Sequence, residues 1–367
     1  MDEQKRILLV NPPSGFLLDD RVFLPLGIAY IAAAAREKGH SVDMLDLAGT
    51  DNYEQRLIDK IKGNHYDAVG FTATSPQFFY AHKMLEGIKK ENLDVKTIIG
   101  GSHASMFSTL RNRLMAKFYS HGLRSDEAAQ RVYDEDPNFK PLEDFDVIAA
   151  GEENSLEKAI ITDEKWVDGG ISTDLDSVPF PARDLFDFKS YLYDSQGTPK
   201  FIIDGKPSGS VISQRGCPYR CEFCCGRDSE MYHKVKVRNL KGETTWRAPS
   251  PERMLAELDD MHEMYGISSF MFYDDELNLN QERTGKLLDL LKTRDYKFRG
   301  FIKSDLLVKH PETAAALKNA GFVEVLTGIE SGSERILGRH LHKGTTPEIN
   351  YRAAMICLEN RLALKAL

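Results

Sequence analysis

The N-terminal 150 residues of this 367-residue chain alternate between short apolar runs and longer amphipathic segments. The first run, RILLVNPP, is aliphatic and ends at two prolines, which is typical of a buried strand. A helix is expected after it, with Pro25 near its start and Gly39 at its end. The pattern continues until five strands alternate with helices, with an irregular insertion expected between the fourth and fifth strands. This order predicts a doubly wound parallel α/β sheet.

Small residues follow three of these expected strands, in the segments TATSP (72–76), GGSHAS (100–105) and GEEN (151–154). Open parallel sheets bind ligands at the carboxyl ends of their strands, and glycine lets a ligand approach the backbone closely. A tight turn alone would explain Gly100 and Gly101, but three such loops at one edge favour a bound ligand. The GxGxxG pattern of dinucleotide-binding domains does not follow the first strand, so a dinucleotide is not expected.

A second series of expected strands and helices begins near residue 208 and has the character of a barrel rather than an open sheet. The segment DLDSVPFPARDLFDFKSYL before it contains two prolines and interrupts the alternation, which is typical of a connector. The sequence therefore predicts a first domain at 1–160, a connector at 161–207 and a partial (β/α) barrel at 208–367. The final residues, LALKAL, are the expected start of a fifth barrel strand, so the barrel is expected to be incomplete at its C-terminal end.

Four of the five cysteines lie in the segment CPYRCEFCC, where Cys217, Cys221 and Cys224 have the spacing CxxxCxxC. Three thiolates on so short a loop can bind three irons of one four-iron four-sulfur cluster and leave the fourth iron open. Zinc is the alternative, but a structural zinc site uses four protein ligands, and no second Cys/His pair has suitable spacing. Cys225 could supply a fourth thiolate, although adjacent side chains rarely converge on one ion.

Composition and charge argue against two classes of partner. The formal net charge of −8 at pH 7 gives no electrostatic reason to expect nucleic acid. The basic segment HKVKVRNLK (233–241) is more typical of a strand with one solvated face than of an anion-binding surface. No run approaches the roughly 18 apolar residues that a membrane span needs, and the N-terminus lacks a signal-peptide pattern. A cytoplasmic location is therefore expected, where clustered cysteines more often bind metal than form disulfides.

The segment CPYRCEFC resembles the CxxxCx(aromatic)C motif of the radical S-adenosylmethionine superfamily, with Phe223 as the aromatic residue. In that family, the open iron chelates S-adenosylmethionine, and reductive cleavage gives methionine and a 5′-deoxyadenosyl radical. The segment GIES (328–331) resembles the family's motif near the ribose and methionine of this cosubstrate. The resemblance implies that Glu330 binds the ribose hydroxyls and Ser331 the carboxylate, with a helix-capping role for Glu330 as an equal alternative.

Two further segments resemble this family. YDDE (273–276) ends an expected strand, so Asp274 and Asp275 are candidates for contact with cosubstrate or substrate, with helix capping as the alternative. HLHKGTTPE (340–348) resembles the family's nKGTt segment, but it also makes a good helix start, which favours a structural role. The S-adenosylmethionine site that the resemblance implies consists of Phe223, Asp274, Ser304, Glu330 and Ser331.

The order of the two domains and their motifs closely resembles the cobalamin-binding radical S-adenosylmethionine enzymes over nearly the whole chain. The first loop, NPPSGF, lacks the DxHxxG signature by which another cobalamin class supplies an imidazole to cobalt, so no protein histidine is expected to bind cobalt. The resemblance implies that the corrinoid and its nucleotide tail are lined by Ser75, Gly100, Gly101, His103, Gly151 and Glu152.

This resemblance implies an enzyme that uses a four-iron four-sulfur cluster, S-adenosylmethionine and cobalamin to methylate an unreactive carbon of a small-molecule or peptide substrate. An electron donor such as flavodoxin or ferredoxin is implied as a partner, and no catalytic residue beyond the cofactor ligands is expected. One alternative is a relative that uses both cofactors for cyclisation or oxidation without methyl transfer. Another is a non-catalytic cobalamin-binding or redox-sensing fragment.

Overall fold

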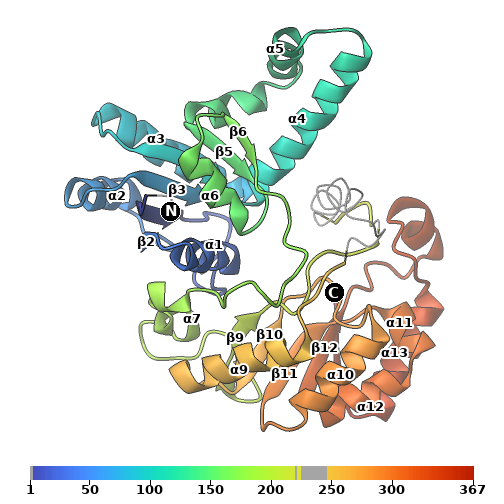
Figure 1. Cartoon of the computed structure of the whole chain (residues 1–367). Coiled ribbons are helices and arrows are strands. Elements are labelled where there is room, and N and C mark those ends of the chain that lie inside the picture. Colours follow the sequence, from blue (N-terminus) through green and yellow to red (C-terminus); the bar gives the residue numbers. More distant parts are fainter. Residues whose placement is uncertain (1–2, 220, 225–245) are drawn as a thin grey trace. The chain divides into compact units, whose positions relative to one another are not determined.

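The computed structural model describes residues 3–219, 221–224 and 246–367 (Figure 1). The basic segment 233–241 and Cys225 lie outside the described residues. None of the described helices combines the length and the apolar character that a membrane span requires.

Two compact units divide the chain. Unit 1 comprises Met1–Ser172 and Val178–Phe188, and unit 2 comprises Thr173–Ser177 and Lys189–Leu367. The segment expected as a connector therefore contributes residues to both units. Each unit is a parallel sheet with helices, as the alternation in the sequence predicts.

Unit 1 contains a six-stranded parallel sheet with the order β2-β1-β3-β4-β5-β6. The sixth strand was not expected from the sequence, because its three residues, WVD, are too short to show a period. The strands are β1 (Arg6–Asn11), β2 (Ser41–Asp46), β3 (Ala68–Thr72), β4 (Lys96–Gly100), β5 (Val147–Ala150) and β6 (Trp166–Asp168).

The helices of unit 1 bury apolar faces against this sheet. Helix α3 starts at a capping box formed by Thr74 and Gln77, with Pro76 in its first turn. The irregular insertion expected between the fourth and fifth strands is mostly helical. The helices are α1 (Leu26–Glu37), α2 (Tyr53–Lys62), α3 (Ser75–Lys90), α4 (Ser102–Ser120), α5 (Ser125–Glu135), the 3-10 helix η1 (Pro137–Asp144), α6 (Asn154–Ile161) and the 3-10 turn η2 (Arg183–Leu185).

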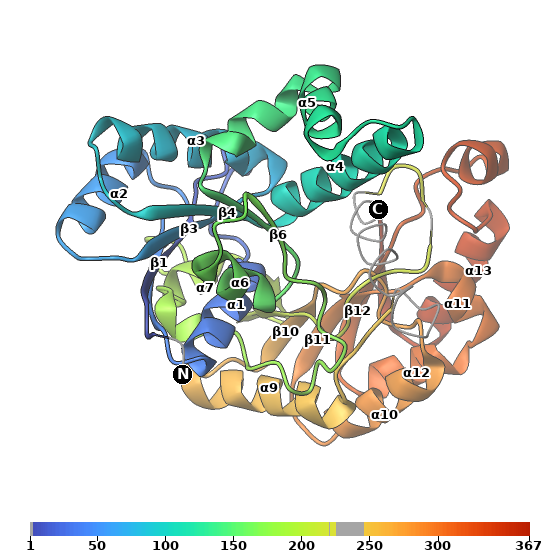
Figure 2. The same ribbon diagram turned by 45° about the horizontal axis from the view of Figure 1, so that its top comes forward.

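The core of unit 1 lies between the central strands and their helices. Every residue of β5 is buried, as is every residue of β1 after Arg6, which agrees with the continuous apolar runs in the sequence. Helix α1 packs beside α6, and α2 packs beside α3 (Figure 2). Phe139 and Phe145 are fully buried in this core. The central strands therefore hold the loops at their carboxyl ends in fixed positions.

Unit 2 contains a five-stranded parallel sheet with the order β13-β12-β11-β10-β9, preceded by a short hairpin of β7 and β8. This is the partial barrel that the sequence predicts, and the segment LALKAL supplies its fifth strand. The strands are β7 (Ile202–Ile203), β8 (Lys206–Pro207), β9 (Gly209–Val211), β10 (Ser269–Phe272), β11 (Lys297–Phe301), β12 (Phe322–Thr327) and β13 (Ala363–Ala366).

The helices of unit 2 follow its strands in turn, and α9, α10 and α12 lie next to one another along the sheet (Figure 2). Phe272 stacks on Phe322, with ring centroids 5.9 Å apart, and both rings are fully buried. The helices are α7 (Lys189–Leu192), α9 (Pro251–Tyr265), α10 (Gln281–Leu291), α11 (Ser304–Lys309), α12 (Glu312–Asn319), the π-helix η3 (Ile336–His340) and α13 (Pro347–Glu359).

Candidate functional site

The three cysteines of the CxxxCxxC motif line one cavity of about 170 Å³ in unit 2. The cavity lies at the carboxyl edge of the sheet, because its other walls are the segments that follow β10, β11 and β12. These segments contribute Glu276, Lys303 and Glu330. Barrel enzymes place their active sites at this edge.

Asp274 fixes the start of the cysteine loop. Its buried carboxylate accepts hydrogen bonds from the backbone N–H and the hydroxyl of Ser213, at 2.6 and 2.5 Å, and from the Gln214 N–H at 3.1 Å. Burial raises the pKa of Asp274 to about 6. The carboxylate thus holds the chain that leads into the loop, and Asp274 does not line the cavity, whereas its neighbours Asp275 and Glu276 do.

A second segment holds the middle of the cysteine loop. The Glu222 N–H donates to the Leu341 carbonyl at 3.0 Å, and His342 Nδ1 lies 3.1 Å from the Glu222 carboxylate. The ammonium of Lys343 lies over the ring of Phe223, 5.3 Å from its centroid. The segment Leu341–Lys343 is thus bound to the two residues between Cys221 and Cys224.

Two lysines bring positive charge to this cavity. Lys303 Nζ donates to Asp305 Oδ1 at 2.6 Å and to the Lys343 carbonyl at 3.1 Å, and it lies 4.2 Å from the centre of the Tyr219 ring. Lys343 Nζ donates to Glu330 Oε1 at 3.1 Å. Glu276 lines the same cavity. Burial raises its pKa to about 8, and the charges of Lys303 and Lys343 partly offset this rise.

The donor set of the cavity fits an iron–sulfur cluster. Burial raises the pKa of Cys217 to about 12, so its thiol keeps its proton until a cation binds. Across the described ranges, no group of three Cys, His, Asp or Glu side chains is arranged to bind a single metal ion. In a cubane each iron takes its own thiolate, so cysteines need not converge on one point. The three cysteines therefore suit a cluster better than zinc.

The structure separates the residues expected at the S-adenosylmethionine site into two groups. Phe223 and Glu330 line the cavity. Ser304 is buried, and its hydroxyl pairs with Thr327 at 3.0 Å, while the Ser331 hydroxyl accepts the Ser333 N–H at 3.1 Å. Neither serine is part of the cavity lining.

Lys303 and Lys343 were not predicted from the sequence as residues of this cavity. Lys303 stands two residues after β11, so the rule that sites lie at carboxyl ends of strands would have found it. Lys343 belongs to a segment interpreted as a helix start, and Thr346 indeed caps α13 by accepting the Ile349 N–H at 3.2 Å. The contact between Lys343 and the cysteine loop joins residues far apart in sequence, and no local pattern reveals it.

The small-residue loops of unit 1 meet at the carboxyl edge of β3 and β4. The Ser75 hydroxyl lies 3.0 Å from His103 Nδ1, and the imidazole stacks on Phe78 with centroids 4.3 Å apart. His103 is buried, and within the described part of the chain its Nε2 has no hydrogen-bond partner. Burial lowers the pKa of His103 to about 4. A neutral imidazole with an unpaired nitrogen at this edge is suited to contact a ligand.

Gly101 brings two of these loops into close contact. It has φ +90°, and a Cβ there would lie 2.7 Å from Ala73 N and 2.8 Å from Ala73 O. Gly100 is the last residue of β4, and Gly151 after β5 also has positive φ, +115°. These glycines leave backbone without side chains at the edge, which suits the approach of a large flat ligand. This edge therefore fits a corrinoid.

Glu152 is directed toward the chain after β6. Its carboxylate accepts the Ser172 N–H at 2.8 Å, and its own N–H donates to the Gly170 carbonyl at 2.9 Å. The neighbouring Glu153 accepts the Ser172 hydroxyl at 2.5 Å. Both carboxylates thus hold the segment that follows the sheet.

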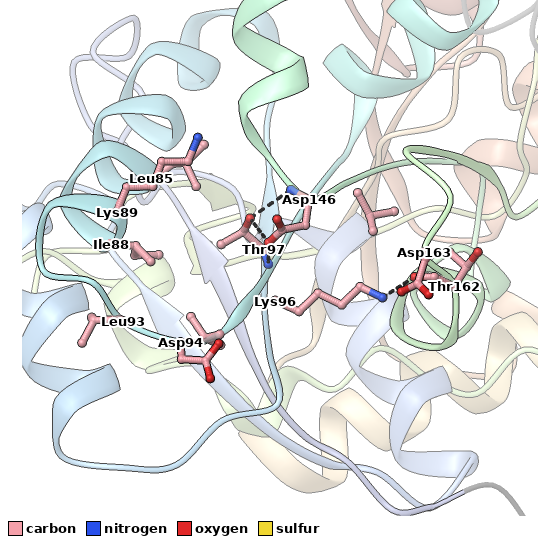
Figure 3. A pocket seen from close by; sticks show the side chains of 12 residues that line it. Leu85, Ile88, Lys89, Leu93, Asp94, Lys96, Thr97, Asp146, Thr162 and Asp163 are labelled. Atoms are coloured by element: carbon pink, nitrogen blue, oxygen red, sulfur yellow. Dashed lines mark hydrogen bonds between the residues drawn. The ribbon is translucent and has the colours of Figure 1, made fainter.

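A larger cavity, of about 580 Å³, lies at the opposite edge of the unit 1 sheet (Figure 3). Two of its polar residues bond each other: the Thr97 N–H and hydroxyl both donate to Asp146 Oδ2 at 2.7 Å. Lys96 Nζ donates to the carbonyls of Ile160 and Thr162. Because it lies at the amino ends of β4 and β5, this cavity is not a ligand site of the usual kind.

Comparison with known proteins matches both units to families. The B12 binding domain matches residues 21–122, and the Radical SAM superfamily matches residues 211–363. An uncharacterized methyltransferase of Pyrococcus horikoshii is 29% identical over 94% of this chain and 69% of its own length. The bacteriochlorophyllide d C-8(2)-methyltransferase of Chlorobaculum tepidum is 24% identical over 80% of this chain and 54% of its own. The anaerobic magnesium-protoporphyrin IX monomethyl ester cyclase of Rubrivivax gelatinosus is 21% identical over 93% of this chain and 58% of its own length.

Two solved structures share the fold over 99% of this chain. The radical S-adenosylmethionine methyltransferase TsrM from Kitasatospora setae, with cobalamin and a [4Fe-4S] cluster bound, has a TM-score of 0.63 at 17% identity and is covered over 66% of its length. The cobalamin-dependent S-adenosylmethionine radical enzyme OxsB, with aqua-cobalamin and S-adenosylmethionine bound, has a TM-score of 0.62 at 19% identity and is covered over 49%. The chain thus spans between about half and two thirds of the length of these relatives.

Proposed function

Because the chain belongs to the radical S-adenosylmethionine superfamily and also carries a B12 binding domain, we propose that it is part or all of a cobalamin-dependent methyltransferase acting on an unreactive carbon. One observation carries the proposal: Cys217, Cys221 and Cys224 line a single cavity at the carboxyl edge of a partial barrel. The named methyltransferases among its relatives favour methyl transfer as the outcome.

The residues of unit 2 would hold the cluster and the cosubstrate. When bound, the cluster supplies the electron that cleaves S-adenosylmethionine, and cobalamin carries the methyl group. Cys217, Cys221 and Cys224 would hold the cluster through their thiolates, and Asp274 keeps the start of their loop in place. Lys303 and Lys343 counter the negative charge of the thiolates. Burial in the cavity strengthens these interactions, because they act in a medium of low dielectric constant.

The residues of unit 1 would hold the corrinoid. Gly100, Gly101 and Gly151 leave backbone open at the sheet edge, and His103 presents its unpaired Nε2 there. We propose that His103 donates or accepts a hydrogen bond with the nucleotide tail, and that it does not bind cobalt. Ser75 fixes the orientation of the ring through its contact with Nδ1.

The substrate is proposed only as a small molecule or a peptide. The methylating relatives are named for a bacteriochlorophyllide, a cytidylyl-2-hydroxyethylphosphonate and a hopanoid, so their names do not point to one substrate class. A one-electron donor such as flavodoxin or ferredoxin is the proposed protein partner, since reductive cleavage consumes one electron. We propose a cytoplasmic location, where clustered cysteines stay reduced.

A single-turnover experiment distinguishes methyl transfer from the alternatives. The chain is reconstituted anaerobically with iron, sulfide and hydroxocobalamin, then reduced with titanium(III) citrate and supplied with S-adenosylmethionine labelled in its methyl group. The proposal predicts S-adenosylhomocysteine and labelled methylcobalamin, both absent when cobalamin is omitted.

The other outcomes identify the competing functions. Formation of 5′-deoxyadenosine with no S-adenosylhomocysteine would indicate a non-methylating relative, a function that the named cyclases support. Neither product, from protein loaded with both cofactors, would indicate a non-catalytic cobalamin-binding or redox protein.

A further inference from the structure

The three cysteines belong to the chain that runs from the end of β9 to the start of α9. We call two parts of this chain the loop base: residues 213–215 after β9 and residues 246–250 before α9. Main-chain hydrogen bonds join the two parts, from the Arg215 N–H to the Arg247 carbonyl at 2.8 Å and from the Arg247 N–H to the Arg215 carbonyl at 3.0 Å. The loop that carries the cysteines is therefore closed at its base.

Arg283, in the first turn of α10, bonds both parts of the loop base. Its Nε donates to the Pro249 carbonyl at 3.0 Å, and its Nη2 donates to the Ser213 carbonyl at 2.7 Å. A guanidinium is planar and presents its donors in a fixed fork, so one side chain can hold two acceptors at a defined separation. The Asn280 side chain accepts the Arg283 N–H at 2.9 Å and caps the helix at this point. Both ends of the loop are thus attached to the start of α10.

Two carboxylates whose charges act on Arg283 also bond the loop base. Burial lowers the pKa of Arg283, while the charges of Asp274 and Asp176 oppose this shift. Asp274 accepts three hydrogen bonds from the start of the loop, and Asp176 Oδ1 accepts the Ser250 N–H at 2.6 Å. Hydrogen bonds to charged groups are stronger than those between neutral groups. The guanidinium and the two carboxylates therefore fix the position of the backbone at the loop base.

We infer that Arg283 is a positioning residue for the iron–sulfur cluster. The inference rests on the proposed function. Ser213 stands four residues before Cys217, so a fixed Ser213 carbonyl limits where the first thiolate can lie. Arg283 does not line the cavity and acts on the cluster through the backbone. Without Arg283, the first thiolate is held less firmly, and iron leaves the cluster sooner.

The remaining contacts of the loop base predict that an Arg283 variant still folds. The Trp246 Nε1–H donates to Gln214 Oε1 at 2.6 Å, and the main-chain bonds between the two parts do not involve Arg283. Asp274 also keeps its bonds to the start of the loop. We therefore expect the variant to take up a cluster but to release its iron faster.

The test measures how fast the oxidised, cluster-loaded chain releases iron to bathophenanthroline disulfonate under anaerobic conditions. We expect Arg283→Met to release iron at least tenfold faster than the unmodified chain, because it loses two charge-assisted hydrogen bonds. Arg283→Lys keeps the charge but lacks the planar fork, so it should release iron at an intermediate rate. After reduction, the cluster of Arg283→Met should also show shifted g values in its electron paramagnetic resonance spectrum, because the first thiolate has moved.

Two controls separate positioning of the cluster from overall stability. Arg294→Met removes the same kind of side chain elsewhere in unit 2, where Nε and Nη2 donate to Asp259 at 2.9 and 2.7 Å. Leu317→Ala removes a fully buried side chain of α12 that does not line the cavity. Urea unfolding of the cluster-free chain should show a clear loss of stability in Leu317→Ala. Neither control should change the rate of iron release by more than twofold or shift the g values.

Each other outcome overturns the inference or the proposed function separately. Iron release from Arg283→Met at the rate of the unmodified chain would show that Arg283 does not position the cluster. Equal acceleration in Arg283→Met and Leu317→Ala, with unchanged g values, would mean that Arg283 acts only through stability. If Arg283→Met fails to retain four irons, Arg283→Lys decides, and a rate equal to that of the unmodified chain contradicts the inference. Failure of the unmodified chain to bind a cluster would refute the proposed function instead.

Discussion

At the scale of single residues, His103 is held in a neutral state by its surroundings. The imidazole is buried between aromatic rings, with Phe78 on one side and Phe107 4.7 Å away between centroids. The only contact described for its Nδ1 is the uncharged Ser75 hydroxyl, at 3.0 Å. A cationic ring there would lose its hydration without gaining a carboxylate, and for this reason its pKa falls to about 4.

This environment predicts an acid-sensitive stability. The folded-state pKa of about 4 lies below the ordinary value of about 6.5, so between these pH values the unfolded chain binds more protons than the folded chain. The neutral His103 contributes about 3 kcal/mol to the free energy of unfolding. This contribution is fully present above about pH 6.5 and is lost as the pH falls toward 4. His103→Gln should remove this part of the pH dependence.

Urea unfolding at pH 4.5, 5.5 and 7.5, followed by tryptophan fluorescence, measures this effect. The exposed His121→Gln serves as the control and should keep the slope of the unmodified chain. An identical slope in His103→Gln would show that another group dominates the acid sensitivity.

The cysteine ligands could be predicted at this scale, but the lysines of their cavity could not. Cys217, Cys221 and Cys224 lie within eight residues, so the short loop alone places them together. Lys303 contacts Tyr219, and Lys343 contacts Phe223, across 84 and 120 residues respectively (303 − 219 and 343 − 223). Such contacts depend on how strands are ordered in the sheet, which residue spacing does not encode.

At the scale of elements, the unit 1 site depends on how closely the loop after β3 approaches the loop after β4. Gly101 N-caps α4, and its missing side chain lets the backbone of Ala73 contact it. The Ala73 carbonyl accepts the His103 N–H at 3.0 Å, and the Ala73 N–H donates to the Gly100 carbonyl at 3.1 Å. The two loops are therefore tied together where the ligand is proposed to bind.

Gly101→Ala should therefore disturb both folding and binding. The added methyl group meets backbone atoms that cannot rotate away, and φ +90° is itself unfavourable for alanine. We expect a loss of about 2–4 kcal/mol in the free energy of unfolding, together with weaker cobalamin binding. Urea denaturation and spectrophotometric titration with hydroxocobalamin measure the two quantities.

Gly122→Ala separates the steric effect from the backbone effect. Gly122 also has positive φ, +82°, but no atom lies within 4 Å of the position of an added Cβ. The Gly122→Ala variant should lose about 1 kcal/mol in the free energy of unfolding and keep the cobalamin affinity of the unmodified chain. If Gly101→Ala and Gly122→Ala lost equal amounts of stability and of cobalamin affinity, the close contact between Ala73 and Gly101 would not be the cause of the losses.

At this scale, individual strands and helices could be predicted from the sequence where the apolar pattern is strong. The continuous apolar runs of β1 and β5 and the helix start at Thr346 are examples. The helices α4 and α5 were not expected. Helix α4 has only a weak apolar stripe, and the clearer stripe of α5 lies within a long insertion that was interpreted as irregular. β6 was missed because three residues cannot show a period.

At the scale of the whole molecule, the chain assigns its two proposed cofactors to separate cores. The cysteine cavity belongs to unit 2, and the glycine-rich edge with His103 belongs to unit 1. Each unit has its own parallel sheet and its own buried apolar cluster. Loss of one cofactor should therefore leave the site of the other intact.

Cys217→Ala tests this independence. Removal of one of three thiolates should abolish stable binding of the cluster, while the affinity for cobalamin should change by less than twofold, because no residue of unit 1 is altered. Iron analysis and cobalamin absorbance after anaerobic gel filtration measure both in one sample. Cys357→Ala, a buried cysteine in α13 away from the cavity, is the control and should retain both cofactors. Loss of cobalamin together with iron in Cys217→Ala would contradict separate sites.

We propose that this chain binds a cluster through Cys217, Cys221 and Cys224 and uses it to cleave S-adenosylmethionine. The most direct measurement is the anaerobic formation of 5′-deoxyadenosine by the reconstituted, reduced chain, with the Cys217→Ala variant beside it. We expect 5′-deoxyadenosine from the unmodified chain and none from the variant. A cluster-loaded chain that forms no 5′-deoxyadenosine, or a variant that forms as much as the unmodified chain, would contradict it.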